Sequence, residues 1–494
     1  MRVASTSTLL LLALASPTAA QLPSVAELDM DLVSSKVEPI KYKYRFPVMV
    51  LEQLAWTMPP TIYYFATTNL QREDFELEWD KESWKKKLVT FDGVVFDTGN
   101  WNSNAFRHPV FGAISYQIGR ANGYSPLAAT LIDFTTAVIW EYVIEYRELV
   151  SLNDLMINTI SGFTIGEPLY QLGRLGDHRD VSWARRSVAA IASPVHTAHV
   201  IAGYPGWKPD VRPWTDFEIS AGGNLADHGS TRSGEVGLDI DLELIRDARY
   251  GVPGTGSQWT GLAAFNRVMG QARFGAGELS RTQFRTATTF FGKYSRSIDD
   301  TIHGSDSFFG LATGFDYETR DLPLETDRFA LFHLFGPKVE LGLWRGTSHL
   351  SWETGAYLDM GMIQAHVFGP VLPFPELPQT SVLQTRGYYF GGGLSATTRL
   401  RLETPVWSAE LEGRAYQQWS VDGRDRMESG AGADDPRGVS DTRFLALAAV
   451  GVRPGIQNAK IELTVEAMAR RGAWKSDERT TKELTTGARV AIPF

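Results

Sequence analysis

The chain has 494 residues, no cysteine and a formal net charge of −9. The absence of cysteine excludes a disulfide framework and a thiolate metal site. The acidic balance argues against binding nucleic acid through a basic face, and the length allows two or three domains.

The first 20 residues show the pattern of a secretory signal peptide. Arg2 precedes an apolar core at residues 9–15, and small residues around Ala20 predict cleavage after it. No later run of about 20 uncharged apolar residues could serve as a membrane helix. We therefore expect an exported chain that is periplasmic, secreted or a membrane barrel. Residues 21–40 are acidic without a period and predict a flexible lead-in.

Residues 41–66 contain two apolar stretches, 46–51 and 62–65, which Pro59 and Pro60 divide. Two interpretations are open for this segment. It is either an interfacial or pore-inserted segment or a helix packed on the domain that follows.

Residues 106–170 have helical patterning. Pro109 is typical of the first turn of a helix, and Asn122-Gly123 marks its end. Ser125-Pro126 then predicts the start of a long apolar helix that reaches about residue 147.

Two polar stripes run along the second and third predicted helices. Ser151 is expected to cap the third helix, with Asp154 at the capping-box position. The second helix carries Asp133, Ala137, Glu141 and Glu145 on one face, and the third carries Ser151, Asp154, Asn158, Gly162 and Gly166. The small residues would let the two backbones approach closely. Buried carboxylates would then be paired, protonated or solvated.

These helices supply the candidate site of the chain. The candidate polar cluster consists of His108, Arg120, Glu141, Glu145, Asp154, Asn158 and Glu167. Carboxylates with one imidazole can bind a divalent ion or act as an acid–base site. The alternative, which we favour, is a satisfied polar core that joins three helices, with His108 and Glu167 as caps. We accordingly expect no metal.

Several short motifs in this region resemble one bacterial family. They are His108-Pro109-Val110-Phe111-Gly112, Gly119-Arg120-Ala121-Asn122-Gly123, Trp140-Glu141-Tyr142, Glu145, Ser151, Asn153-Asp154-Leu155, and Gly162 through Gly166-Glu167. At these positions the chain is similar to the domain-of-unknown-function family 3943. It departs from the family pattern at Arg107, where the family has glycine, and at Asn158-Thr159, where it has Thr-Pro. The resemblance implies an envelope protein with a helical segment ahead of a barrel, and it implies no activity.

Residues 215–494 alternate between apolar and polar positions with a period of two. In residues 407–419 the odd positions are apolar apart from Gln417 and carry Trp407 and Trp419 at their ends, whereas the even positions include Glu410, Glu412 and Arg414. Residues 235–244, 394–403 and 461–470 repeat the pattern. Strands with one apolar and one polar face are typical of membrane barrels, where tryptophan lies at the lipid interface.

The C-terminal segment shows the same alternation. Gly487, Val490, Ile492 and the terminal Phe494 belong to a strand that resembles the C-terminal recognition strand of outer-membrane barrels. A half-buried strand of a soluble sheet is the alternative for this segment alone. The resemblance predicts the barrel-assembly machinery as a partner during biogenesis.

The loops between the predicted strands alternate in length. Residues 366–384, 421–440 and 472–481 predict long loops, and residues 345–348, 404–405 and 454–458 predict short turns. Outer-membrane barrels combine short periplasmic turns with long outer loops. We therefore predict an all-β transmembrane barrel of about 12 antiparallel strands (roughly 10–14) at residues 215–494. An α-helical domain at residues 41–214 is expected to precede it.

The polar rows would face the barrel lumen. They include Glu410, Glu412, Arg414, Glu462, Glu466, Arg470 and Arg489. A solvated or cross-paired lumen wall is the simpler interpretation, and a substrate path is the alternative.

Catalytic motifs are weak. His196 and His199 could be a ligand pair on a helix but lack the glutamate of a metalloprotease motif, and Ser348-His349 falls at a predicted turn. The sequence contains neither a Gly-x-Ser-x-Gly elbow nor a phosphate-binding loop, so no cofactor is expected.

We predict an outer-membrane barrel whose helical region plugs the lumen or docks at the periplasmic mouth. Its expected role is structural, or the binding and transport of an envelope lipid or small solute. Outer-membrane lipid is its expected partner. The alternative is a lipid-modifying enzyme, a hydrolase or acyl transferase, that uses the His108, Glu141 and Asp154 cluster.

Overall fold

The computed structural model describes residues 44–493. The ranges 68–76, 79, 97–98, 178–182, 205–213, 230, 323–324, 370–386, 422–437 and 456–458 are excepted. The predicted signal peptide, the lead-in at residues 21–40 and Phe494 lie outside the described residues.

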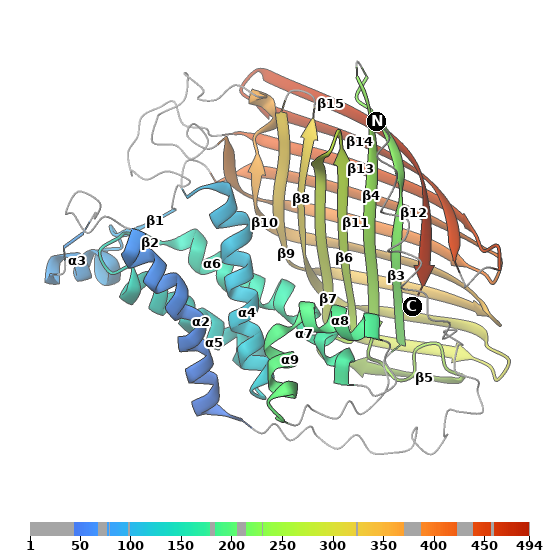
Figure 1. Ribbon diagram of the computed structural model, residues 1–494, viewed down its shortest axis with the longest axis horizontal. Coiled ribbons are helices and arrows are strands. Elements are labelled where there is room, and N and C mark those ends of the chain that lie inside the picture. The colour runs from blue at the N-terminus through green and yellow to red at the C-terminus, as the bar shows by residue number, and fades with distance from the viewer. Residues whose placement is uncertain are drawn as a thin grey trace, which may run out of the picture.

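Twelve antiparallel strands form a closed barrel (Figure 1). They are β3 (Trp214–Asp227), β4 (Arg232–Ile245), β6 (Phe265–Gly275), β7 (Glu278–Ile298), β8 (His303–Leu322), β9 (Glu325–Arg345), β10 (Ser348–Gln364), β11 (Tyr388–Glu403), β12 (Trp407–Ser420), β13 (Ser440–Val452), β14 (Lys460–Trp474) and β15 (Asp477–Pro493). Neighbours in sequence pair with one another, and β15 pairs with β3 to close the ring. A short strand, β5 (Gly254–Thr260), pairs with the part of β7 that β6 does not reach. The predicted fold and strand number are confirmed.

Five of the six connections with a predicted length have that length, but the alternation does not extend to the rest of the barrel, where the connections at 276–277 and 299–302, at opposite ends, are both short. Residues 472–481 were expected to form a long charged loop, but β14 and β15 pair from Trp474 opposite Asp477 to the other end of the hairpin. The connection is therefore a tight turn, in which Lys475 adopts a positive φ of 53°. The charged residues lie in the outer ends of two long strands, so their polarity did not mark a loop.

The two rows of each strand face different surroundings. On β12, Leu411 is 56% exposed on the outside, whereas Glu412 and Arg414 are buried on the inside. On β14, Leu463 is 65% exposed and Glu462 is buried. The barrel thus has an apolar exterior and a charged interior, as the period-two pattern predicts.

The helical region precedes the barrel. Its helices are α2 (Phe46–Thr67), α3 (Lys81–Lys85), α4 (His108–Ala121), α5 (Pro126–Ile139), α6 (Leu152–Ser161), α7 (Glu167–Gly173), α8 (Trp183–Ala192) and α9 (Pro194–Ile201). The Ser125 side chain caps α5 and the Ser151 side chain accepts a hydrogen bond from the Asp154 N–H at the start of α6, as predicted. A π-helical turn at Gly162–Gly166 joins α6 to α7.

The apolar segment around Pro59 and Pro60 forms one helix, α2, which continues through both prolines. It packs on α4, where the Gln53 side chain donates to the Ser115 carbonyl at 2.8 Å and the Trp56 indole donates to the Phe111 carbonyl. Both contacts hold the part of the helix that precedes Pro59 and Pro60, which lack the N–H group of other residues.

Glycines let α4, α5 and the α6–α7 run approach closely. A Cβ atom on Gly112 would lie 2.0 Å from the Asn158 carbonyl oxygen, and one on Gly162 would lie 2.1 Å from the Asp133 carboxylate. The predicted close contact of the acidic and small-residue stripes therefore occurs.

Candidate functional site: the wall-packed helical domain

The helical domain lies against the outside of the barrel wall (Figure 1). On β8, Asp316 and Glu318 form ion pairs across the lumen with β12 and β13, so the alternate residues Phe315 and Tyr317 face outward. Phe315 shares a hydrophobic core with Ile157 of α6. The other buried members of this core are Trp101, Ala105, Ala113, Ile165, Ala330, Phe332, Met362, Tyr388 and Phe390.

A second contact lies at the other end of the helical domain. Leu172 of α7 and Ala192 of α8 pack on Phe217, Leu242 and Leu244, which are the outward residues of β3 and β4. The two cores place helices over the outer face from β3 to β11.

Specific contacts tie the domain to the wall between these two cores. The Thr286 hydroxyl of β7 donates to the Thr164 carbonyl at 2.6 Å, and the rings of Phe163 and Phe290 stack with centroids 4.7 Å apart. The sequence predicted a lumen plug or a domain docked at the periplasmic mouth, whereas the described helices pack along the outer wall. The apolar residues of the helices pack on the apolar outer wall, whereas charged side chains fill the lumen.

A buried ion pair lies inside the helical domain. The Arg120 Nε donates to Glu167 Oε2 at 2.7 Å, and the Tyr116 hydroxyl donates to the same carboxylate oxygen at 2.7 Å. Glu167 is fully buried and Arg120 is nearly so. The Arg120 guanidinium also lies over the Tyr170 ring. Glu167 therefore joins α7 to α4 through a buried ion pair, and it does not act as the predicted helix cap.

Asp133 lies in the interior of the helical domain. Its side chain is completely buried against Gly162, within the contact of α5 with the α6–α7 run. A carboxylate buried without a cation costs several kcal/mol, so we expect Asp133 as the neutral acid (on the order of 2–7 kcal/mol for an unpaired polar group).

A second polar group lies at the start of α4. The His108 Nε2 is 3.6 Å from Asp154 Oδ1, and the Glu141 carboxylate accepts a hydrogen bond from the Ser151 N–H at 2.8 Å. Asp154 also accepts from the Asn153 amide at 3.0 Å. His108 keeps 22% of its side chain exposed, whereas Asp154 and Glu141 are buried.

The predicted cluster is thus two groups, one at each end of α4. Twelve residues of helix separate His108 from Arg120, which corresponds to about 18 Å. Asn158 contributes its backbone to the contact with Gly112, and the Glu145 carbonyl accepts from Lys87. No group of three or more metal-binding side chains occurs within residues 44–493 as far as they are described.

The weaker histidine motifs do not form sites. His199 Nε2 lies 2.6 Å from Glu52 of α2, whereas His196 packs against the Tyr170 ring. His349 stacks on Trp344, with the ring centroids 3.7 Å apart.

The charged rows are cross-paired through the lumen. Several ion pairs connect β7 or β8 with strands on the opposite wall, and the four shortest bind them at 2.6–2.8 Å. These four are Arg281–Glu466, Arg285–Glu412 and Arg320–Glu483, each at 2.6 Å, and Arg443–Glu318 at 2.8 Å. Small pockets remain in the lumen, one of about 90 Å³ beside Arg281 and Glu466 and one of about 60 Å³ beside Arg285. The lumen is therefore filled by its own side chains.

Sequence reasoning missed a polar triplet in the lumen. Both the Ser395 hydroxyl and Asp359 Oδ1 contact the same nitrogen of His333, Nδ1, at 3.0 and 2.8 Å. A Ser–His–Asp relay uses both ring nitrogens, so this arrangement is a structural network. The three residues lie on β9, β10 and β11, and only the pairing of those strands could have placed them together.

The predicted C-terminal residues lie in β15. Val490 faces outward, and Gly487 faces the lumen, where a Cβ would lie 2.1 Å from the Asn224 side chain. Ile492 is half-buried beside β3. A closed barrel with an apolar exterior and a charged interior is the architecture of outer-membrane proteins.

Known proteins add a family to this description. Residues 93–195 match the family described as Domain of unknown function (DUF3943). The match covers the helices that pack on the barrel wall, and it includes every member of the predicted polar cluster.

Solved barrels resemble the chain only distantly. The translocator domain of the autotransporter NalP from Neisseria meningitidis is 13% identical, with a TM-score of 0.19, and the match covers 62% of this chain and 98% of NalP's domain. The NanC porin is 8% identical, with a TM-score of 0.22, and coverage of 55% and 98%. The channel DcaP of Acinetobacter baumannii is 10% identical, with a TM-score of 0.18, and coverage of 57% and 97%. These likenesses carry no argument about function. No curated protein matches the chain.

Proposed function

We propose that this protein is a closed outer-membrane barrel that anchors a lipid-immersed helical domain, and that this domain binds an envelope lipid. The observation that carries the proposal is the apolar face that α2 and α5 turn away from the barrel. Its exposed residues are Leu51, Leu54, Met58, Ile62, Leu127, Leu131, Phe134, Ile139 and Val143. A surface of this kind is unusual in contact with water, and hydrocarbon already surrounds the neighbouring strands of such a barrel.

The helical run Pro126–Ile144 supports this placement. Among the residues that the structure describes, it is the one helix long and apolar enough to cross a membrane, by length and composition. The core helix of a soluble protein can meet the same criteria, but it would be mostly buried, whereas this run is 28% buried.

The polar interior suggests a binding role. Charged and polar groups at the depth of a membrane are costly and commonly serve function. His108, like Glu145, is partly exposed at the surface of the helical domain, so its imidazole can meet a lipid headgroup while Asp154 stays buried behind it.

The filled lumen argues against a channel. Reconstituted in a planar bilayer, the full-length protein should show no stable conductance steps, because ion pairs from opposite walls occupy the barrel axis. Regular ohmic steps would instead favour solute transport.

Photocrosslinking tests the lipid-binding proposal. The full-length protein would be reconstituted with a phospholipid that carries a diazirine on one acyl chain, and crosslinked peptides would be mapped by mass spectrometry. We expect crosslinks on α2 and α5 in addition to the outward residues of β12–β14. Substitution of His108 by alanine should then reduce crosslinking by a headgroup-labelled lipid and leave acyl-chain crosslinks unchanged. Crosslinks confined to the strands would contradict the proposal.

A lipid-modifying enzyme is a second candidate, which the partly exposed His108 beside Asp154 favours. An imidazole next to a carboxylate can act as a general base. Lipid mass spectrometry of membranes that contain the wild type or the His108→Ala variant, at equal barrel yield, tests this idea. Identical lipid profiles would rule it out.

A further inference from the structure

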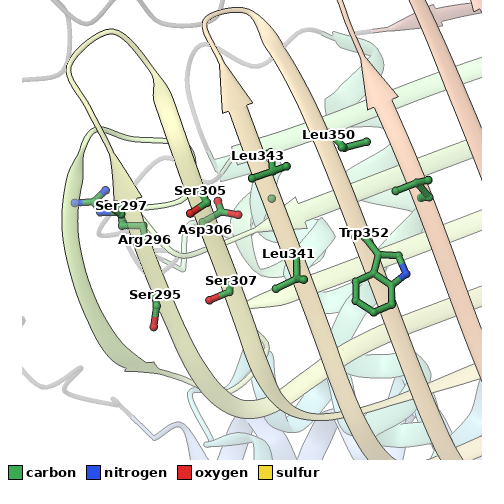
Figure 2. Close-up of a pocket in the computed structure, with 12 residues that line it drawn as sticks. Ser295, Arg296, Ser297, Ser305, Asp306, Ser307, Leu341, Leu343, Leu350 and Trp352 are labelled. Atoms are coloured by element: carbon green, nitrogen blue, oxygen red, sulfur yellow. The ribbon is translucent and has the colours of Figure 1, made fainter.

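A hollow of about 480 Å³ lies on the outer wall of the barrel, beside the turns at residues 299–302 and 346–347. Figure 2 shows serines of β7 and β8 beside Leu341 and Leu343 of β9 and Trp352 of β10. The opposite row of these strands faces inward, where Asp306 accepts hydrogen bonds from Tyr294 and Trp344. The serines and leucines therefore face the hydrocarbon and its interface.

Small polar side chains form the floor of the hollow. Ser295 lies opposite Ser307, and Ser297 lies opposite Ser305, in the pairing of β7 with β8. Leu341 and the other apolar residues of β9 to β11 form a higher ridge along one side. The remaining members of that ridge are Leu343, Leu350, Trp352 and Leu400. Hydroxyl groups beside aliphatic side chains suit a molecule with one polar and one apolar end.

A lysine adjoins the hollow on the same outward row. Lys293 is exposed two residues from Ser295, and it lies opposite Trp259 and Phe309 on the neighbouring strands. Within the described part of the chain no ion pair or hydrogen bond engages its ammonium group. An outward cation at the edge of an apolar belt is expected to extend toward the interface and attract anionic headgroups.

We propose that this hollow is a binding site for one diacyl phospholipid. The phosphate would accept hydrogen bonds from Lys293 and the serine hydroxyls, and an acyl chain would lie along the ridge of Leu341 and Leu343. The hollow opens onto the surface that the bilayer covers. Its lining includes one cation, Arg296, and one carboxylate, Asp306, and the adjoining Lys293 adds a charge opposite to that of a phosphodiester. The inference goes beyond the proposed function and shares with it only the bilayer around the barrel.

Retention of lipid by the full-length protein tests the proposal. Protein reconstituted with phosphatidylglycerol, or with a diacylglycerol of the same chains, would be transferred to detergent and its bound lipid counted by native mass spectrometry. We expect the wild type to retain one phosphatidylglycerol per chain more than Ser295→Leu/Ser307→Leu, which fills the hollow, so a lipid held by the helical domain does not enter the difference. Diacylglycerol should be retained equally by the two proteins. Lys293→Gln should lower the retention due to the hollow about fivefold.

Matched controls lie on the outer row of β15. Lys482→Gln repeats the lysine change and Thr486→Leu replaces another hydroxyl residue by leucine, both at exposed positions away from the hollow. Both variants should retain lipid as the wild type does. A heat-dependent shift in electrophoretic mobility would verify that each variant forms a barrel.

Two outcomes would overturn the proposal. Equal retention of phosphatidylglycerol by the wild type and both hollow variants would show that the retained lipid lies elsewhere, on the helical domain or as annular lipid. An equal wild-type excess of diacylglycerol would remove the role of the phosphate. Crosslinking of the helical domain reports on a different surface, so the proposed function can fail while this inference stands, and the reverse also holds.

Discussion

The barrel and the helical domain both enclose polar groups behind an apolar exterior, but they stabilise those groups differently. In the barrel, charges pair redundantly, since Glu318 contacts Arg281, Arg320 and Arg443. In the helical domain, Arg120 has Glu167 as its carboxylate partner, and glycines bring the backbones into contact. The comparison teaches that the barrel should tolerate the loss of one charge, whereas the helical domain should not.

The sharpest test of this contrast is Arg120→Met. Loss of one partner leaves Glu167 as an uncompensated buried charge, so the helical domain should lose about 3–5 kcal/mol of stability. Helical circular dichroism during urea unfolding would measure the loss. The double variant Arg120→Met/Glu167→Leu removes both charges and should recover most of the stability. Equal losses in the single and double variants would contradict the account.

Close packing through glycine predicts the next largest effect. Gly112→Ala places a Cβ 2.0 Å from the Asn158 carbonyl oxygen, so α4 must move away from α6 at a cost of about 1–3 kcal/mol. Gly176→Ala is the matched control, because its nearest neighbour would be the Ala189 Cβ at 3.4 Å. If both variants unfold at the same urea concentration, the helix contact is looser than described.

A single lumen charge should matter less. Arg443→Gln leaves Glu318 with Arg281 and Arg320, so the barrel should lose only about 1.5 kcal/mol, as for one hydrogen bond to a charged group. Tryptophan fluorescence during guanidinium unfolding would measure it. A loss as large as that of Arg120→Met would show that the lumen network is not redundant.

The smallest loss of stability is expected for an exposed ion pair at the outer end of β14 and β15. Arg471 and Glu478 are both more than half exposed, so Glu478→Gln should change barrel stability by about 0–1 kcal/mol, and less at high salt. A salt-independent loss above that range would contradict this assignment.

Local sequence patterns predicted the individual helices and strands better than they predicted how these elements pack together. The period of two in residues 407–419 and 461–470 fixes which side chains face the lumen, and Ser125 and Ser151 mark helix starts because their hydroxyls can cap only there. The position of the helices was not predictable in this way. Phe315 and Tyr317 form an apolar outward row whether lipid or a helix covers them.

The candidate site shows the same limit. The stripes on the second and third predicted helices were expected to meet, and the Glu141 carboxylate of one accepts from the Ser151 N–H of the other. No stripe predicted the approach of His108 to Asp154. The stripes could not show that α4 holds His108 and Arg120 at opposite ends, because a stripe gives the face of a helix and not the distance between partners on other helices.

The central claim is that lipid covers the outer face of α5, and fluorescence quenching tests it most directly. The chain has no native cysteine, so single cysteines at Leu131, at Leu463 on the barrel exterior and at Lys85 can each carry one environment-sensitive dye. Bromine-labelled lipids should quench the dye at position 131 as strongly as at 463, while aqueous iodide should quench only the dye at position 85. Quenching by iodide but not by brominated lipid at position 131 would contradict the account.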